Sequence, residues 1–304
     1  MFHPGHLTVG TVFAIEAYDG DVPTMKNQVE LAKRAEELGF SALWFRDVPL
    51  HDPNFGDVGQ VYDPWSYLGY ITAHTRTISL ATGAIIFPLR HPVDLAKAAA
   101  SIDQLSGGRL VLGIAAGDRP IEYPAYGRSY EDREALFQAS VSDFRRLYAD
   151  FPRYESVFGI MDGGDLIPKP FSGKIPLFVT GHSGQSLEWI AENADGWLMY
   201  PRDPSFQKRV VDGWKSALEL TGNRFKPFSQ SLYIDLADDP DHLPQSIHLG
   251  YRLGRNYLLK HLKTLQDIGV NHVFLNLKYG KRPADEVLEE VGKFITPHFP
   301  SLKK

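Results

Sequence analysis

One segment combines several residue types that could bind a ligand. Thr180–Ser186 (TGHSGQS) is a Gly- and Ser-rich turn between an apolar run and a helical pattern. Such a turn offers backbone N–H groups, hydroxyl groups and the positive end of a helix dipole, and that combination binds phosphate or another anion. Simple capping of the helix by Ser183 explains the same residues. The segment by itself leaves both interpretations open.

Other reactive patterns are missing from the chain. None of the 11 His residues forms an H-E-x-x-H motif, so the sequence predicts no metal site. In Gly181–Gly184 (GHSG) the serine lies one place too late for the G-x-S-x-G elbow of a serine hydrolase. The chain has 0 Cys, which excludes a disulfide framework, a thiolate metal site and a cysteine nucleophile.

Composition narrows the class of protein further. The 304 residues are 43% hydrophobic and 23% charged, with a net charge of −5, which is typical of a folded globular protein. No apolar run approaches the ~18 residues of a membrane span, and Met1–Gly10 has no secretory pattern. The acidic balance argues against a nucleic-acid partner. We therefore expect a cytoplasmic enzyme.

The sequence contains a recurring structural unit, and this unit must position any ligand-binding site. Lys33–Phe45 (KRAEELGFSALWF) and Lys263–Leu277 (KTLQDIGVNHVFLNL) both read as an amphipathic helix, a glycine and a short apolar run. Gly39 and Gly269 are placed to end these helices in the left-handed conformation. The apolar runs have no polar face, which is typical of strands buried in a parallel sheet.

Eight such units can be counted along the chain. The expected strands are Leu7–Phe13, Ala42–Phe45, Ser79–Ala84, Leu110–Ile114, Leu177–Thr180, Gly196–Met199, Ser231–Leu236 and His272–Leu277. The helices expected after them are Thr24–Leu38, Pro64–Thr75, Pro92–Leu105, Tyr130–Leu147, Gln185–Glu192, Ser205–Leu220, Gly254–Asp267 and Ala284–Phe294.

This count predicts an α/β fold: one (β/α)8 TIM barrel with insertions, a single domain over residues 1–304. A doubly wound open sheet is the alternative, and the missing G-x-G-x-x-G after the first strand disfavours its dinucleotide-binding form. Arg153–Lys174 and Asp238–Gly250 are too long for plain connections. The second follows a strand and is a candidate lid or pocket wall, whereas the first enters at the opposite face unless it doubles back.

Four segments together resemble one family. They are, in chain order, Ile102–Arg109 (IDQLSGGR), Gly113–Asp118 (GIAAGD), Tyr123–Arg133 and Thr180–Gly196. Their order and spacing are similar to those of the bacterial luciferase-like flavin-dependent monooxygenase superfamily, in a luciferase-type oxidoreductase subgroup. The likeness covers about residues 7–200.

The resemblance implies a barrel that binds FMN, or in one branch the deazaflavin F420, at the carboxyl ends of the strands. It places a non-prolyl cis peptide at Gly83–Ala84 beneath the flavin ring, Ala115–Asp118 beside the ring, and Arg133 at the phosphate. The implied cofactor-binding residues are Thr82, Gly83, Ala84, Ala115, Gly117, Asp118, Arg133, Gly181, His182, Ser183, Ser186, Trp197 and Tyr200. Core packing of Trp197 and Tyr200, and pairing of Arg133 with Glu131 or Glu134, are the alternatives.

The chain also departs from the family's pattern. Val48 stands where luciferases carry a catalytic histidine, and Ala116 stands where a second phosphate-binding arginine is found. Light emission is therefore not expected. His51, Arg46 and Asp47 are the candidates for catalytic acid–base or substrate-orienting work.

The function implied is oxidation of a small organic substrate with O2 and reduced FMN from a separate flavin reductase. The resemblance also implies a homodimer. F420-dependent hydride transfer, a non-catalytic flavin-binding protein and a barrel without flavin are the alternatives.

Overall fold

Eight parallel strands close into a barrel in the computed structural model, which describes residues 2–223 and 225–302. Around the barrel the order is β1, β2, β3, β5, β8, β9, β10 and β13, and β13 pairs again with β1. The bounds are Thr8–Val12 (β1), Ala42–Phe45 (β2), Ser79–Thr82 (β3), Leu110–Ala115 (β5), Leu177–Thr180 (β8), Gly196–Met199 (β9), Phe228–Leu236 (β10) and His272–Asn276 (β13). The expected TIM barrel is confirmed.

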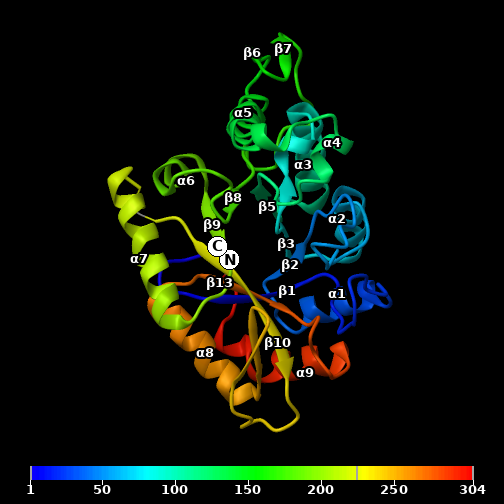
Figure 1. Cartoon of the computed structure of the whole chain (residues 1–304), viewed down its shortest axis with the longest axis vertical. Coiled ribbons are helices and arrows are strands. Elements are labelled where there is room, and N and C mark those ends of the chain that lie inside the picture. Colours follow the sequence, from blue (N-terminus) through cyan, green and yellow to red (C-terminus); the bar gives the residue numbers. More distant parts are fainter. Residues whose placement is uncertain (1, 224, 303–304) are drawn as a thin grey trace.

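In the described part of the chain, eight helices of seven residues or more surround the strands in chain order (Figure 1). They are α1 (Gln28–Glu37), α2 (Pro64–His74), α3 (Pro92–Ser106), α5 (Arg133–Arg146), α6 (Leu187–Asn193), α7 (Pro204–Leu220), α8 (Arg255–Ile268) and α9 (Ala284–Phe294), and α4 (Glu122–Ala125) is a single short turn. No helix in the described part of the chain is long and apolar enough to cross a membrane.

Local backbone chemistry accounts for the differences from the expected boundaries. The helix expected from Thr24 begins only at Gln28, because Met25 and Asn27 adopt positive φ angles of 58° and 56°. The expected strand Ser79–Ala84 ends at Thr82, and a two-residue strand, β4 (Ile85–Ile86), continues beside β5 after the Gly83–Ala84 peptide. Gly39 and Gly269 have φ angles of 80° and 105°, as predicted for helix ends.

Both long insertions form hairpins. The segment after α5 carries β6 (Arg153–Ser156) and β7 (Gly159–Asp162), and its tip doubles back to the start of α3, where His91 Nε2 lies 2.9 Å from the Phe158 carbonyl. The insertion after β10 carries β11 (Gln245–Ile247) and β12 (Gly250–Leu253). Because β12 pairs with the carboxyl end of β10, this hairpin extends the barrel wall above its mouth.

The L-S-G-G-R turn lies at the amino-terminal end of the barrel, away from its mouth. Gly107 and Gly108 take φ angles of 70° and 81°, which lets the chain reverse at the end of α3. The side chain of Arg109 then donates hydrogen bonds to main-chain carbonyls of Thr72, Thr75, Ile78 and Ser106, and to the Thr75 hydroxyl. This motif therefore ties α2, β3 and α3 together and serves the fold.

We expect Arg109→Ala to lower the free energy of unfolding by about 2–4 kcal/mol, because several buried carbonyls lose a charged donor. Urea unfolding followed by circular dichroism measures the change. Arg76→Ala, whose side chain is exposed near the same turn, is the control and is expected to stay within about 0.5 kcal/mol of the wild type. Equal values for the two variants would contradict this role.

Candidate functional site

A cavity of about 770 Å³ opens at the carboxyl ends of the barrel strands. This is the end at which TIM-barrel enzymes hold their active sites, and the volume suits a cofactor together with a small substrate. The expected site residues that line it are Arg46, Asp47, Gly83, Ala84, Ala115, Gly117, Asp118, Arg133, Gly181, His182, Ser183 and Tyr200.

Four expected residues lie elsewhere. Thr82 is fully buried and donates to the Gly113 carbonyl at 2.7 Å. Trp197 is a core side chain whose indole N–H donates to the Gly181 carbonyl at 2.6 Å, so it supports the turn from behind. Ser186 caps α6 by accepting the Trp189 N–H. His51 lies on an exposed loop, 3.2 Å from Asp21.

Small residues form one wall of the cavity. The Gly83–Ala84 peptide is cis, as the resemblance implies, and Gly83 lies against the ring of Trp44. Ala115 and Gly117, at the end of β5, continue this wall. Gly117 has a φ of 85° and is packed so closely on Ile86 that an added Cβ would lie 2.8 Å from its Cγ2 atom. Both glycines therefore pack closely against neighbouring side chains, where a larger residue would not fit.

The Gly181–Gly184 turn presents backbone donors to one end of the cavity. The N–H groups of His182, Ser183 and Gly184 have no acceptor among the residues that the structure describes. The chain turns through positive φ angles at Gly181 (58°), Ser183 (49°) and Gly184 (73°). Successive free N–H groups on such a curved backbone attract an anion.

The sequence left two interpretations of this turn open: that it binds an anion, or that Ser183 caps the following helix. Ser186, and not Ser183, caps the helix, which starts at Leu187 instead of Gln185. The Ser183 hydroxyl donates to the Thr180 carbonyl at 2.9 Å and accepts the Ala116 N–H at 3.1 Å. Ser183 therefore fixes the turn against the end of β5, and its backbone N–H is the group that is free.

Arg133 lies beside this turn, at the start of α5. Its guanidinium stacks 4.1 Å above the ring centroid of Tyr130 and donates to the Tyr130 carbonyl at 3.0 Å. It also pairs with Glu134 at 3.2 Å, as one interpretation of the sequence expected. That carboxylate is half-exposed, so the pair contributes little and does not prevent Arg133 from binding an anion in the cavity.

Arg46 and Asp47 follow β2 but have different partners. Asp47 is buried and forms a bidentate ion pair with Arg90, and it accepts the Ile86 N–H at 3.0 Å. It thereby fixes the segment after β3 beneath the cavity. Arg46 pairs instead with Asp57 at 2.7 Å.

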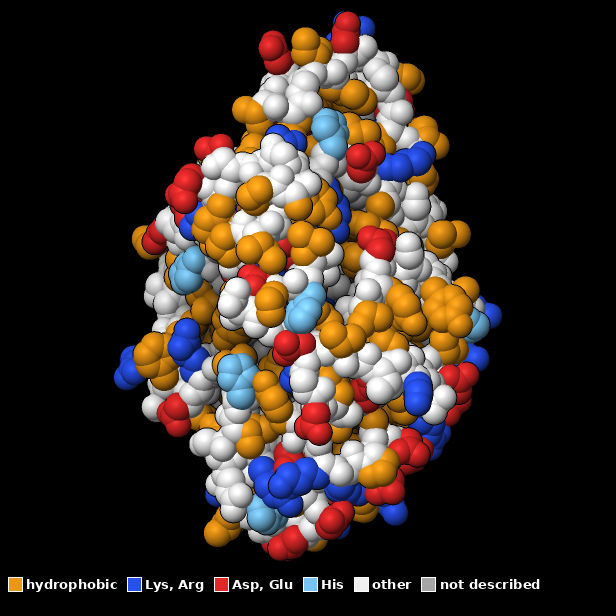
Figure 2. All heavy atoms as spheres, turned by 45° about the vertical axis from the view of Figure 1, so that its right-hand side comes forward, with side chains coloured by type: hydrophobic (Ala, Val, Ile, Leu, Met, Phe, Trp, Pro, Cys, Tyr) orange, Lys and Arg blue, Asp and Glu red, His pale blue; other side chains and the backbone are white. Residues whose placement is uncertain are grey.

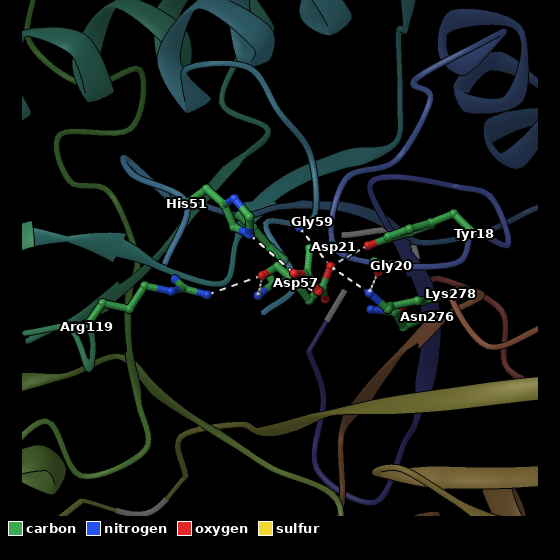
Figure 3. Close-up of polar contacts among 10 residues, drawn as sticks. Tyr18, Gly20, Asp21, His51, Asp57, Gly59, Arg119, Asn276 and Lys278 are labelled. Carbon is green, nitrogen blue, oxygen red and sulfur yellow. Dashed lines mark hydrogen bonds and ion pairs between the residues drawn. The ribbon is translucent and has the colours of Figure 1, made fainter. Parts of the chain in front are cut away.

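Asp57 collects donors from several loops around the mouth (Figure 3). Its carboxylate accepts the Tyr18 hydroxyl at 2.6 Å and pairs with Arg46 at 2.7 Å and with Lys278 at 3.3 Å. Burial opposes ionisation, but the charge of Arg46 and the hydrogen bonds outweigh it and lower the pKa of Asp57 to about 2. The same burial and the neighbouring carboxylate raise the pKa of Tyr18, so the phenol keeps its proton.

Aromatic residues form the wall opposite the small residues. Tyr233, His248 and Tyr279 contact one another, with ring centroids 5.3 to 5.9 Å apart. His248 belongs to the insertion after β10, so the structure places that insertion in the cavity wall. Lys278 and Tyr279 directly follow β13, so the rule that barrel sites follow strand ends could have found them. No sequence signal identified Asp57.

Asp57→Asn tests this cluster. We expect it to lower the free energy of unfolding by about 1.5–3 kcal/mol, because Arg46 and Lys278 lose their shared counter-charge in a mostly buried position. Asp162→Asn breaks an exposed pair with Arg153 and is the control, expected to change stability by less than about 0.5 kcal/mol. A D57N protein as stable as D162N would show that the cluster does not hold the loops.

Glu122 gives a prediction for pH. Its side chain is fully buried, Oε1 accepts the Leu50 N–H at 3.4 Å, and burial raises the pKa to about 7. The folded protein then binds more protons than the unfolded chain between about pH 4.5 and 7, so rising pH lowers stability across this window. We expect Glu122→Gln to remove this loss of stability, which is on the order of 3 kcal/mol.

Urea unfolding at a series of pH values compares Glu122→Gln with the wild type. Glu131→Gln, at an exposed position nearby, is the control. Parallel stability curves for all three proteins between pH 5 and 8 would contradict the shifted pKa of Glu122.

Comparison with known proteins finds a family model and several relatives, among them a monooxygenase and a reductase. Residues 3–247 match the family model described as luciferase-like monooxygenase. The uncharacterized protein Rv0953c of Mycobacterium tuberculosis (strain ATCC 25618 / H37Rv) is 31% identical over 243 residues, covering 72% of this chain and 82% of that protein. The 5,10-methylenetetrahydromethanopterin reductase of Archaeoglobus fulgidus is 29% identical over 72% of this chain and 63% of its own length. The alkanal monooxygenase alpha chain of Photorhabdus luminescens is 25% identical over 60% of this chain and 51% of its own length.

Solved structures share the fold. The monooxygenase RslO1 from Streptomyces bottropensis superposes with a TM-score of 0.75 at 19% identity, covering 96% of this chain and 99% of that chain. An F420-dependent secondary alcohol dehydrogenase superposes with a TM-score of 0.77 at 18% identity, covering 95% and 98%.

Proposed function

The chain belongs to the luciferase-like monooxygenase family, and from this premise we propose that it is an FMN-dependent monooxygenase acting on a small organic substrate. Reduced FMN would come from a separate flavin reductase, and O2 is the second substrate. The anion site formed by Arg133 and the free N–H groups of the Gly181–Gly184 turn supports a cofactor that carries a phosphate. The net charge of −5 favours FMN over F420, whose acidic tail would suit a basic groove.

The residues present fit a flavin mononucleotide. Gly181 lines the cavity, and an added Cβ would meet no atom within 4 Å, so the turn leaves room for a phosphate. The N–H groups of His182, Ser183 and Gly184 and the guanidinium of Arg133 would hold that phosphate. Ala115–Gly117 and the Gly83–Ala84 peptide would support the ring.

Bound reduced FMN supplies the electrons with which O2 is activated for oxidation of the substrate. The protein's own part is to orient the ring and to keep water from the reacting atoms. Tyr200, Tyr233 and Leu249 also line the cavity, and a substrate would bind beside them. Val48 lines the cavity at the position of the luciferase histidine, so no imidazole acts there.

F420-dependent hydride transfer is the second candidate. The relative from Archaeoglobus fulgidus is a methylenetetrahydromethanopterin reductase, and its identity to this chain is similar to that of the other relatives. The same turn and the same wall would hold either cofactor. A non-catalytic flavin-binding role remains as the alternative for a family member without the histidine. By the family resemblance we also propose a cytoplasmic protein that forms a homodimer, and sedimentation of the purified protein tests the dimer.

A fluorescence titration with FMN and, in parallel, with F420 tests the proposed function. We expect FMN to bind more tightly than F420, and O2 uptake to follow when a flavin reductase supplies reduced FMN. Preference for F420 would assign the protein to the hydride-transfer branch. Retention of flavin without O2 uptake with any substrate would favour the binding protein, and binding of neither cofactor would leave the resemblance as one of fold.

Arg133→Ala tests the phosphate end of the site. We expect it to weaken FMN binding by about 1.5–3 kcal/mol, roughly 10- to 150-fold in Kd, because a charge-assisted hydrogen bond is lost. Arg146→Ala, in the last turn of the same helix and outside the cavity, is the matched control. Equal FMN affinity of the two variants would exclude Arg133 from the phosphate site.

A further inference from the structure

Arg119 is a buried cation that forms no ion pair within 4.0 Å among the residues that the structure describes, although its charge acts at longer range on the buried carboxyl group of Glu122. It lies in the loop between β5 and α4, is only 4% exposed and lines the cavity. Its Nη2 atom donates to the backbone carbonyl of Asp57 at 3.2 Å, and its guanidinium stacks on Phe55 at 4.6 Å from the ring centroid. Nε is buried and has no acceptor among the described residues. Burial of an unpaired charge is costly unless a ligand supplies the counter-charge.

The other cations of the cavity already have partners. Arg46 and Lys278 share the carboxylate of Asp57, and Arg133 lies at the opposite, phosphate-binding end. Figure 3 shows Arg119 and Lys278 approaching the Asp57 cluster from opposite sides. Arg119 is thus the cation that this part of the cavity leaves for a ligand.

The charge of that ligand is limited by the nearby carboxylates. Asp21 and Asp118 also line the cavity, and a dianion would be repelled by both. One guanidinium with donors to spare matches a planar monoanion such as a carboxylate. The rings of Tyr233 and Tyr279, next to Lys278, offer an apolar surface for the rest of the molecule. Figure 2 shows acidic and basic side chains intermingled on the face that it draws.

We propose that Arg119 binds a carboxylate of the substrate, so that the protein acts on a small organic acid with an apolar or aromatic body. The proposal rests on the proposed function, because the cofactor must leave this side of the cavity free. A carboxylate on the tail of F420 offers the same chemistry from another source, and the experiment separates the two.

Calorimetric titration of the cofactor-free protein with benzoate and with benzamide provides the test, because the two probes share a shape and differ in charge. We expect the wild type to bind benzoate at least about 10-fold more tightly than benzamide. Arg119→Gln should abolish the preference, and Arg119→Lys should retain part of it. Arg128→Gln, which lies after α4 and outside the cavity, is the control and should keep the full preference.

Several outcomes would overturn the proposal. Equal binding of benzoate and benzamide by the wild type would do so without any variant, even if Arg119→Gln failed to fold. If Arg119→Gln kept the full preference for benzoate over benzamide, Arg119 would not be the carboxylate-binding residue. If that variant instead lost affinity for F420, Arg119 would be assigned to the cofactor. If benzoate is preferred but neither FMN nor F420 binds, the proposed function fails while the carboxylate site stands.

Discussion

The ion cluster at Asp57 is the constraint on which the mouth of this barrel depends. The residue lies in the long loop between β2 and α2, yet its carboxylate and carbonyl bind groups that follow β1, β2, β5 and β13. Partly buried charges are stable only when an opposite charge or a hydrogen bond compensates them. The loops that carry these charged residues must therefore lie close together. The cavity keeps its shape because one carboxylate joins segments that are far apart in the sequence.

The two ends of the cavity are built by different means. At the end near Arg133 the main chain supplies the donors, through a turn whose positive φ angles leave three N–H groups free. At the end near Asp57 side chains supply the charges, and they are largely paired with one another. The first arrangement suits a cofactor phosphate of fixed shape, whereas the second can change with the substrate by substitution of single residues.

The most distinctive motif of the sequence proved to belong to the fold. Arg109 of the L-S-G-G-R turn donates hydrogen bonds to main-chain carbonyls at the amino-terminal end of the barrel, where residues contribute to stability and not to the active site. The G-x-x-x-G-D segment, by contrast, ends β5 at the mouth and contributes Ala115, Gly117 and Asp118 to the cavity. The motifs of a family resemblance therefore include residues that stabilise the fold and residues that line the cavity. Only their positions at one or the other end of the strands distinguish the two.

The sequence by itself determined the barrel, because alternating amphipathic helices and wholly apolar strands can bury their faces in few other ways. It also pointed to the Gly181–Gly184 turn, a local pattern that follows a strand, whereas Arg133 and the end of β5 were implied by the family resemblance, and all three line the cavity. Only the tertiary structure showed that Ser186 is the cap, that His51 lies outside the cavity, and that Asp57, Arg119 and Lys278 meet. Ion pairs between distant loops have no periodicity in the sequence, because they form only where the closed barrel brings those loops together.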